Sequence, residues 1–92
     1  MNLCYPADVR RYRSGTVGLF FSDVPEATTV GKTLTEALDH APDALIVALS
    51  AYVDDGRAIP SARRGRRGQP VVCLPPLVAL KLAIHDAMTQ QR

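Results

Sequence analysis

The chain has 92 residues, of which 47% are hydrophobic, and its aromatic residues are three Tyr and two Phe with no Trp. This length predicts one small domain whose core is built mostly from Ala, Val and Leu. No stretch approaches the ~20 apolar residues of a membrane-spanning helix, and the amino terminus lacks a signal-peptide pattern. We therefore expect a cytoplasmic protein that does not enter a membrane.

The net charge of +2 conceals an uneven distribution of charge along the chain. Residues 1–56 carry four Lys/Arg and eight Asp/Glu, a net charge of −4, whereas residues 57–92 carry seven Lys/Arg and one acid, a net charge of +6. An acidic body joined to a basic segment predicts two kinds of binding partner, one cationic and one anionic.

The first third of the chain predicts a β-hairpin followed by a third short strand. A first strand is expected over residues 3–9, with Pro6 favouring a sheet edge, and a second over residues 17–21. The polar segment 10–15 between them ends in Ser-Gly, which is typical of a tight turn. After a corner at residues 23–26, residues 27–30 supply the third strand.

The longest predicted element is an amphipathic helix that begins after Thr33 and ends before Gly56. Thr33 and Glu36 have the spacing of a capping box. Pro42 lies inside the helix, and we expect a kink rather than a break because the apolar stripe continues beyond it. His40 is expected on the solvent side. The stripe recurs every three or four residues: Leu34, Ala37, Leu38, Ala41, Leu45, Ala48, Leu49 and Tyr52.

The carboxyl-terminal third predicts a linker, a strand and a second helix. Residues 61–69 are rich in Gly and Arg and indicate a flexible linker, and residues 71–74 indicate a fourth strand. A second helix starts at the two prolines 75–76, and its apolar side has no evident cover in so small a domain: Leu77, Leu80, Ile84 and Met88. We therefore expect a homo-oligomer, and we divide the chain into a body (1–60), a linker (61–70) and a strand–helix segment (71–92).

Cys4 and Cys73 each lie in an apolar, strand-like segment. Because chains without secretion signals seldom form disulfides, we expect two reduced, buried thiols. Two cysteines do not make a zinc site, and neither His40 nor His85 stands at ligand spacing from them. We expect no metal ion and no cofactor.

The sequence contains no motif of nucleophilic, phosphate-binding or metal-dependent catalysis. Asp8, Asp23 and Glu36 are the carboxylates that a nuclease-like metal site would use. A turn explains Asp23 and a helix cap explains Glu36, so we expect no enzymatic activity, including no nuclease activity.

Two charged segments are candidates for binding surfaces. Between Val17 and Gly56 the chain has seven acidic residues and a single basic one, Lys32. A solvated surface and a surface that binds a basic protein both explain this excess of negative charge. The basic run comprises Arg63, Arg64, Arg66 and Arg67. It suits phosphate contacts without sequence preference, although a solvated linker is the simpler explanation and no aromatic residues are interleaved for base reading.

Three segments resemble the HicB antitoxin family in their order and spacing: YPADV (5–9), FFSDVPEATTVGKTLTEAL (20–38) and ALSAYVDDGRAIPS (48–61). The matching positions are Tyr5-Pro6, Phe21 to Glu26, Thr29 to Thr33, Glu36-Ala37, Ala48-Leu49, Tyr52, Gly56 and Ile59-Pro60. The segment VVCLPPLVALKLAIHDAM (71–88) resembles the strand and helix that precede a helix-turn-helix in one subclass of that family.

The resemblance implies an α+β protein with a partial ribonuclease-H-like fold that lacks the catalytic carboxylates. That fold has a three- to four-stranded, mainly antiparallel sheet with one long helix packed on it and a short carboxyl-terminal helix. The resemblance also implies an antitoxin that covers the active site of a HicA-type, mRNA-cleaving toxin and regulates its own operator through a carboxyl-terminal domain. This sequence departs from the family pattern at Pro42, in its Arg-rich linker and in stopping at Arg92. The resemblance therefore supports the expectation of toxin binding more strongly than that of operator binding.

A ribonuclease of this kind presents a basic groove to RNA, and we expect the acidic body to dock against it. The predicted partner-binding residues are the apolar anchor Phe20 and the acids Asp23, Glu26, Asp54 and Asp55. The alternative is a small nucleic-acid-binding or regulatory module that uses Arg63, Arg64, Arg66 and Arg67, and it includes a weak DNA contact. A ribonuclease-H-like metal hydrolase is the third hypothesis.

Overall fold

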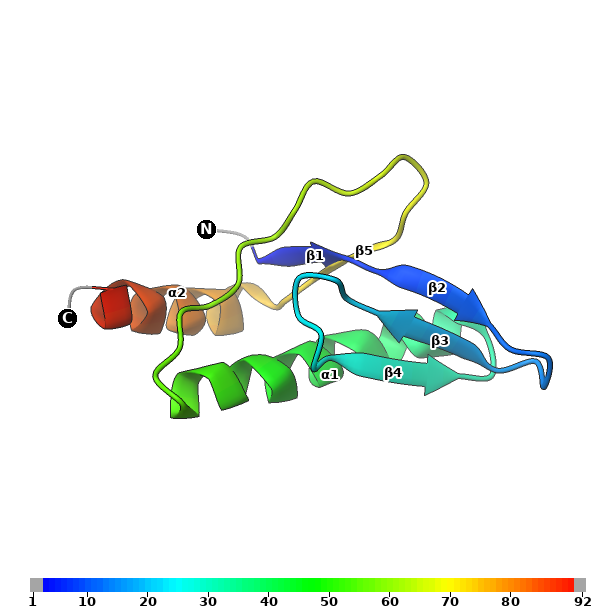
Figure 1. Cartoon of the computed structure of the whole chain (residues 1–92), viewed down its shortest axis with the longest axis horizontal. Helices are drawn as coiled ribbons and strands as arrows, with labels where there is room; N and C mark the ends of the chain where they lie inside the picture. The colour runs from blue at the N-terminus through cyan, green and yellow to red at the C-terminus, as the bar shows by residue number, and fades with distance from the viewer. Residues whose placement is uncertain (1–2, 91–92) are drawn as a thin grey trace.

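A computed structural model describes residues 3–90 of the chain and shows an α+β protein with antiparallel sheets (Figure 1). The strands are β1 (Cys4–Pro6), β2 (Asp8–Arg11), β3 (Val17–Phe20), β4 (Thr28–Gly31) and β5 (Val71–Cys73), and the helices are α1 (Leu34–Asp54) and α2 (Pro76–Gln90). Within the described residues, neither helix is long and apolar enough to cross a membrane.

The predicted hairpin is present as the first two strands of a three-stranded sheet with the order β2-β3-β4. Tyr12 N–H donates to the Thr16 carbonyl at 2.9 Å, and Gly15 closes the turn with a φ of 93°. Glycine adopts this left-handed conformation without steric cost. The sequence therefore predicted the turn at Gly15 and the second and third strands correctly, to within one residue at their ends.

The prediction of one continuous strand over residues 3–9 requires correction, because the chain changes partner at Ala7. The segment before it, β1, pairs with β5 in a separate two-stranded sheet, whereas β2 pairs with β3. Ala7 N–H donates to the Pro70 carbonyl at 2.8 Å, which extends the register of β1 and β5 by one residue, and the pairing with β3 begins at Asp8. The predicted fourth strand therefore exists but does not extend the main sheet.

The prediction of two reduced, buried thiols is wrong, since Cys4 and Cys73 form a disulfide. The antiparallel register of β1 and β5 places these residues directly opposite each other, with their Cα atoms 3.9 Å apart. Cys4 is half-buried and Cys73 is exposed. Their separation of 69 positions in the sequence hides this pairing from any local sequence pattern.

Local signals define both ends of α1. At its start, Glu36 N–H donates to the Thr33 hydroxyl at 3.1 Å, the first half of the predicted capping box. At its end, Gly56 has a φ of 69° and donates to the Val53 carbonyl, while Arg57 N–H reaches the Tyr52 carbonyl. This pattern is a Schellman motif. The helix continues through Pro42.

The core lies between α1 and one face of the main sheet. The helix contributes the predicted residues Ala37, Ala41, Leu45, Ala48 and Leu49. The bulkiest fully buried side chains elsewhere are those of Tyr5, Leu19, Phe21 and Val24.

Gly31 brings β4 and α1 into close contact at the point where the helix starts. A Cβ atom at this position would lie 2.6 Å from the backbone nitrogen of Ala37. Because such a contact is shorter than any tolerated by a real side chain, only glycine fits here.

The second helix packs on the same core through Ala79 and Leu82, with Val78 partly buried against it. The apolar side predicted from the sequence faces away from the core. Its members are largely exposed: Leu77 (64%), Leu80 (54%), Ile84 (53%) and Met88 (65%).

Loss of the disulfide should destabilise the protein without changing its fold. Closing a loop of this length restricts the unfolded chain, so we expect reduction, or the double change Cys4→Ser and Cys73→Ser, to lower the free energy of unfolding by about 2–4 kcal/mol. Urea titration with and without reductant measures the change, and reductant should have no effect on the double variant. Labelling of both cysteines by an alkylating reagent in the absence of reductant would contradict the prediction.

Stability should fall at alkaline pH because of Tyr5. Burial, helped by the negative charge of Asp23, raises the pKa of Tyr5 from 10.0 to about 12. The unfolded chain therefore loses this proton at a lower pH than the folded protein, and the free energy of unfolding decreases as the pH rises from 10 to 12. Urea titrations across this range test the effect.

Tyr5→Phe is the matched variant, since it retains the ring but cannot ionise. It loses the 2.8 Å hydrogen bond to the Pro60 carbonyl, which costs about 1 kcal/mol below pH 10. Its stability should depend less steeply on pH than that of the wild type. Equal pH dependence in the two proteins would show that Tyr5 does not cause the decline.

Candidate functional site

The predicted linker is a loop held against the body at several points. Arg63 binds Asp23 with both its backbone and its side chain: Nε lies 3.0 Å from Oδ1, and the amide donates to Oδ2 at 2.9 Å. Asp23 sits in the tight turn after β3, where its side chain is 4% exposed. The carboxylate is thus almost enclosed by its own chain.

A second attachment point lies at Asp8. One of its carboxylate oxygens accepts from Arg66 Nη2 at 2.9 Å and from Gln69 Nε2 at 3.0 Å, and the other accepts from Ser22 Oγ at 3.0 Å. Together with Asp23 and Arg63, these groups line a polar pocket of about 290 Å³. Arg63 and Arg66 neutralise the two acids of this pocket, and Arg64, which also lines it, leaves one positive charge in excess.

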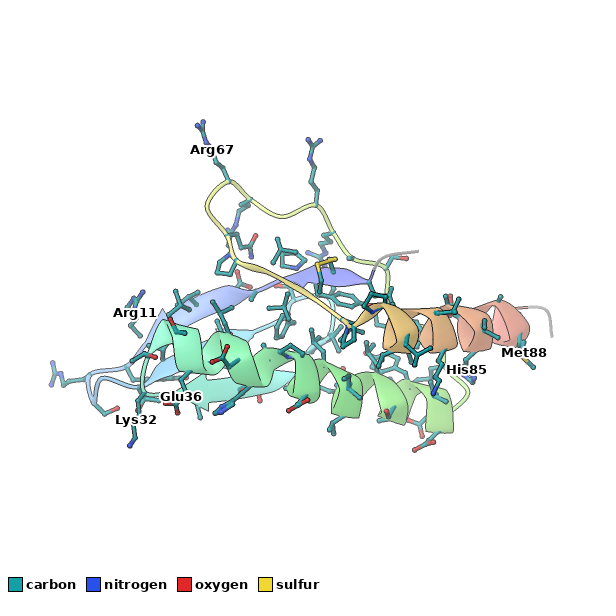
Figure 2. The ribbon with its side chains drawn as sticks, turned by 180° about the vertical axis from the view of Figure 1, so that it is seen from behind. Arg11, Lys32, Glu36, Arg67, His85 and Met88 are labelled. Atoms are coloured by element: carbon teal, nitrogen blue, oxygen red, sulfur yellow. A yellow bond between two sulfur atoms is a disulfide. The ribbon has the colours of Figure 1, made fainter. Side chains whose placement is uncertain are left out.

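The predicted nucleic-acid-binding arginines therefore fall into two pairs. Arg63 and Arg66 are occupied by the ion pairs with Asp23 and Asp8. Arg64 and Arg67 are exposed, and within residues 3–90 neither forms an ion pair. Arg67 points away from the body at the crest of the loop (Figure 2).

Glu26 and Asp55 share one cation at the end of α1. Arg57 Nη2 lies 3.4 Å from Glu26, and Arg57 Nε lies 3.5 Å from Asp55. The Tyr52 hydroxyl donates to Glu26 at 2.8 Å, and the Arg57 guanidinium lies over the Tyr52 ring at 3.9 Å. The hydrogen bond from Tyr52 is the main reason why the pKa of Glu26 is lowered and that of Tyr52 is raised.

The solvent side of α1 carries a different set of acids. Glu36, Asp39, Asp43 and Asp54 recur at intervals that return to one side of a helix. The helix contains no Lys or Arg, and within residues 3–90 none of these four acids forms an ion pair. We call these four residues the acidic face. Val47, which is 72% exposed, stands among them.

The sheet face opposite α1 presents aromatic side chains. Phe20 is half-buried, and the Arg10 guanidinium lies 5.4 Å from the centre of its ring. Tyr12, which is 41% exposed, lies beside Gly18 together with Phe20. Val30 is 55% exposed on the same face.

The structure thus separates the predicted partner-binding residues by their surroundings. Asp23 is enclosed, Glu26 and Asp55 share Arg57, Asp54 is exposed without an ion pair, and Phe20 lies on the opposite face of the sheet. Sequence reasoning missed the ion pairs of Arg63 and Arg66 because their partners lie 40 and 58 residues away.

The carboxylates considered for metal-dependent hydrolysis are not gathered together. Asp8 and Asp23 face guanidinium groups, whereas Glu36 lies at the start of α1. Within residues 3–90, no group of three or more His, Cys, Asp or Glu is placed to hold a metal ion.

Comparison with known proteins gives consistent matches. Residues 4–83 match the model of a family described as the HicB-like antitoxin of bacterial toxin–antitoxin systems. The chain is 42% identical to Antitoxin HicB of Pseudomonas fluorescens (strain Pf0-1) over 77 residues, which is 83% of this chain and 53% of that protein. It is 36% identical to Antitoxin HicB 2 of Photorhabdus laumondii over 91 residues, 99% of this chain and 63% of that protein.

Antitoxin HicB of Escherichia coli (strain K12) is 33% identical over 86 residues, 94% of this chain and 62% of that protein. The chain therefore spans between 53% and 63% of the length of these relatives.

Among solved structures, the fold resembles the crystal structure of the N-terminal domain of Burkholderia pseudomallei antitoxin HicB. The TM-score is 0.62, and the match covers 79% of this chain and 96% of that domain at 13% identity. At this identity the likeness shows the fold alone.

Proposed function

Because this chain belongs to the HicB-like antitoxin family of bacterial toxin–antitoxin systems, we propose that it binds a HicA-type, mRNA-cleaving toxin and neutralises it by covering its active site. The observation that carries the proposal is the acidic face of α1. A ribonuclease binds RNA phosphates with a basic surface, and four carboxylates that form no ion pair within residues 3–90 are complementary to such a surface.

The loop acids have smaller roles in this proposal. Asp54 belongs to the acidic face. Glu26 and Asp55 contribute only the part of their negative charge that Arg57 does not neutralise. Asp23 is held by Arg63 and acts mainly by fixing the loop. Phe20 is the proposed apolar anchor, because it is a half-buried aromatic on the sheet face opposite α1.

We also infer that the protein acts by binding rather than by catalysis. Asp8, Asp23 and Glu36 are the carboxylates that a nuclease-like metal site would use, but arginine neutralises Asp8 and Asp23, and Glu36 lies at the start of α1. The activity belongs to the cytoplasm, where mRNA is the target of the toxin.

Nucleic-acid binding is the second candidate function. Arg64 and Arg67 support it because they are exposed and without ion pairs within residues 3–90. Two arginines suit a weak, salt-sensitive contact to DNA phosphates, and such a contact would serve autoregulation of the operon.

The apolar side of α2 supports a homo-oligomer. Leu77, Leu80 and Ile84 follow the spacing of a helix–helix seam, and each is more than half exposed. An exposed seam of this kind is normally covered by another helix.

Sedimentation equilibrium should therefore show a concentration-dependent dimer or larger species. The double change Leu80→Gln and Ile84→Gln should shift the protein to the monomer, because it places polar groups at the centre of the seam. Val47→Gln is the control, since it removes an apolar side chain of α1 that is even more exposed, at 72%. A monomer at every concentration would rule the proposal out.

Toxin binding is tested with two triple variants that remove the same charge. Asp39→Asn, Asp43→Asn and Asp54→Asn change the acidic face, whereas Asp23→Asn, Glu26→Gln and Asp55→Asn change acids that are already paired. At low salt we expect the first set to slow association with the cognate toxin about tenfold, and the second set to slow it less. Stopped-flow or surface-plasmon measurements at two salt concentrations give both rates.

Equal rates for the wild type and the acidic-face variant at low salt would refute the electrostatic part of this proposal. The anchor is tested separately, since Phe20→Ala should weaken toxin affinity about thirtyfold through faster dissociation. Wild-type affinity in this variant would remove Phe20 from the interface.

A further inference from the structure

The hydrogen-bond pattern of the main sheet shows which backbone groups of β4 lack a partner strand. Bonded and non-bonded pairs alternate along antiparallel strands. The bond from Tyr12 N–H to the Thr16 carbonyl fixes the phase of this alternation. Alternation from that bonded pair along the register turns the amide and carbonyl of Leu19 in β3 toward β4. There they exchange hydrogen bonds with Thr29.

It follows that the amide and carbonyl groups of Val30 and Thr28 point away from β3. The position of His40 agrees, because its Nδ1 lies 3.4 Å from the Val30 carbonyl oxygen. Since β4 is the last strand in the order β2-β3-β4, no strand within residues 3–90 pairs with this edge, and the His40 ring is the side chain that an added strand would displace from the Val30 carbonyl. Open edges of this kind are where proteins accept an added strand from a partner.

A shallow groove of about 500 Å³ lies between this edge and α1. On the helix side, His40 and Asp43 line one part of the groove, and the rest is formed by the small or aliphatic side chains of Ala44, Val47, Ala48 and Ala51. An added strand would turn every second side chain toward this wall, and small residues leave room for them.

Charge decides which occupant fits the groove. Asp43 and Glu26 line it, and Asp39 continues the acidic face beside it. A second copy of this chain at the same edge would bring its own acidic face close to this one, which like-charge repulsion disfavours. A basic segment gains from the same acids.

We propose that β4 accepts an extended, basic segment of a partner protein as an additional antiparallel or parallel strand. Its aliphatic side chains enter the groove beside Val47, and its Lys or Arg side chains reach Asp43. The inference rests on the proposed function, in which the segment belongs to the toxin, and it specifies how that partner docks.

The test uses a capped hexapeptide of alternating Lys and Val as a basic extended probe. Titration into the labelled protein, followed by amide NMR, should shift the amide signals of Thr28, Val30 and their neighbours. The matching hexapeptide of alternating Glu and Val should bind at least about tenfold more weakly. Equal binding of both peptides, or shifts confined to other surfaces, would overturn the proposal.

Two pairs of variants locate the binding edge. Val30→Pro removes an outward amide without breaking the ladder to β3, and Val9→Pro does the same at the opposite edge on β2. We expect about tenfold weaker peptide binding for Val30→Pro alone. Asp43→Asn should weaken binding, whereas Asp54→Asn, an equal charge change outside the groove, should not. Unfolding temperatures verify that all four variants are folded.

The same variants separate this inference from the proposed function. Normal toxin binding by Val30→Pro would place docking elsewhere and overturn the strand-addition inference, while leaving toxin binding itself intact. Failure of the wild type to bind toxin, together with specific peptide binding at β4, would refute the proposed function and retain the site.

Discussion

The contact between Gly31 and the first turn of α1 determines which surfaces this small protein exposes. A Cβ atom at Gly31 would lie 2.6 Å from the Ala37 nitrogen, so helix and strand meet backbone to backbone at this point. Small residues along α1, among them Ala41 and Ala48, maintain the close approach over the sheet. The rotation of α1 is thereby fixed, and its acidic face is directed into solvent beside the edge of β4.

Internal pairing then decides which charges remain for a partner. Asp8 and Asp23 hold the Arg-rich loop, and Glu26 holds Arg57 at the end of α1. Exposed ion pairs contribute little stability individually, but these contacts position a long loop that has few apolar groups. Within residues 3–90, the acidic face of α1 forms no ion pair, and neither do Arg64 and Arg67 of the loop nor Arg10, Arg11 and Arg13 of the β2–β3 hairpin.

Two segments at opposite ends of the chain complete the core. The pairing of β1 with β5 is only three residues long, and the Cys4–Cys73 disulfide reinforces it. Val72, Leu74, Ala79 and Leu82 from the carboxyl-terminal segment join the same apolar cluster as Tyr5. The strand and second helix expected from the sequence exist as β5 and α2. The segment expected to be a flexible linker is instead a loop attached to Asp23 and Asp8.

The sequence alone determined the features that depend on neighbouring residues. The turn at Gly15, the Thr33 cap, the apolar stripe of α1 and the family motifs all follow from local spacing, because hydrogen bonds and periodic burial within one element involve residues a few positions apart. Only the tertiary structure decided the disulfide, the division of the first strand, the pairing of Asp8 and Asp23 with arginines, and the open edge of β4. Each depends on residues tens of positions apart meeting in a particular register, and no local pattern encodes that meeting.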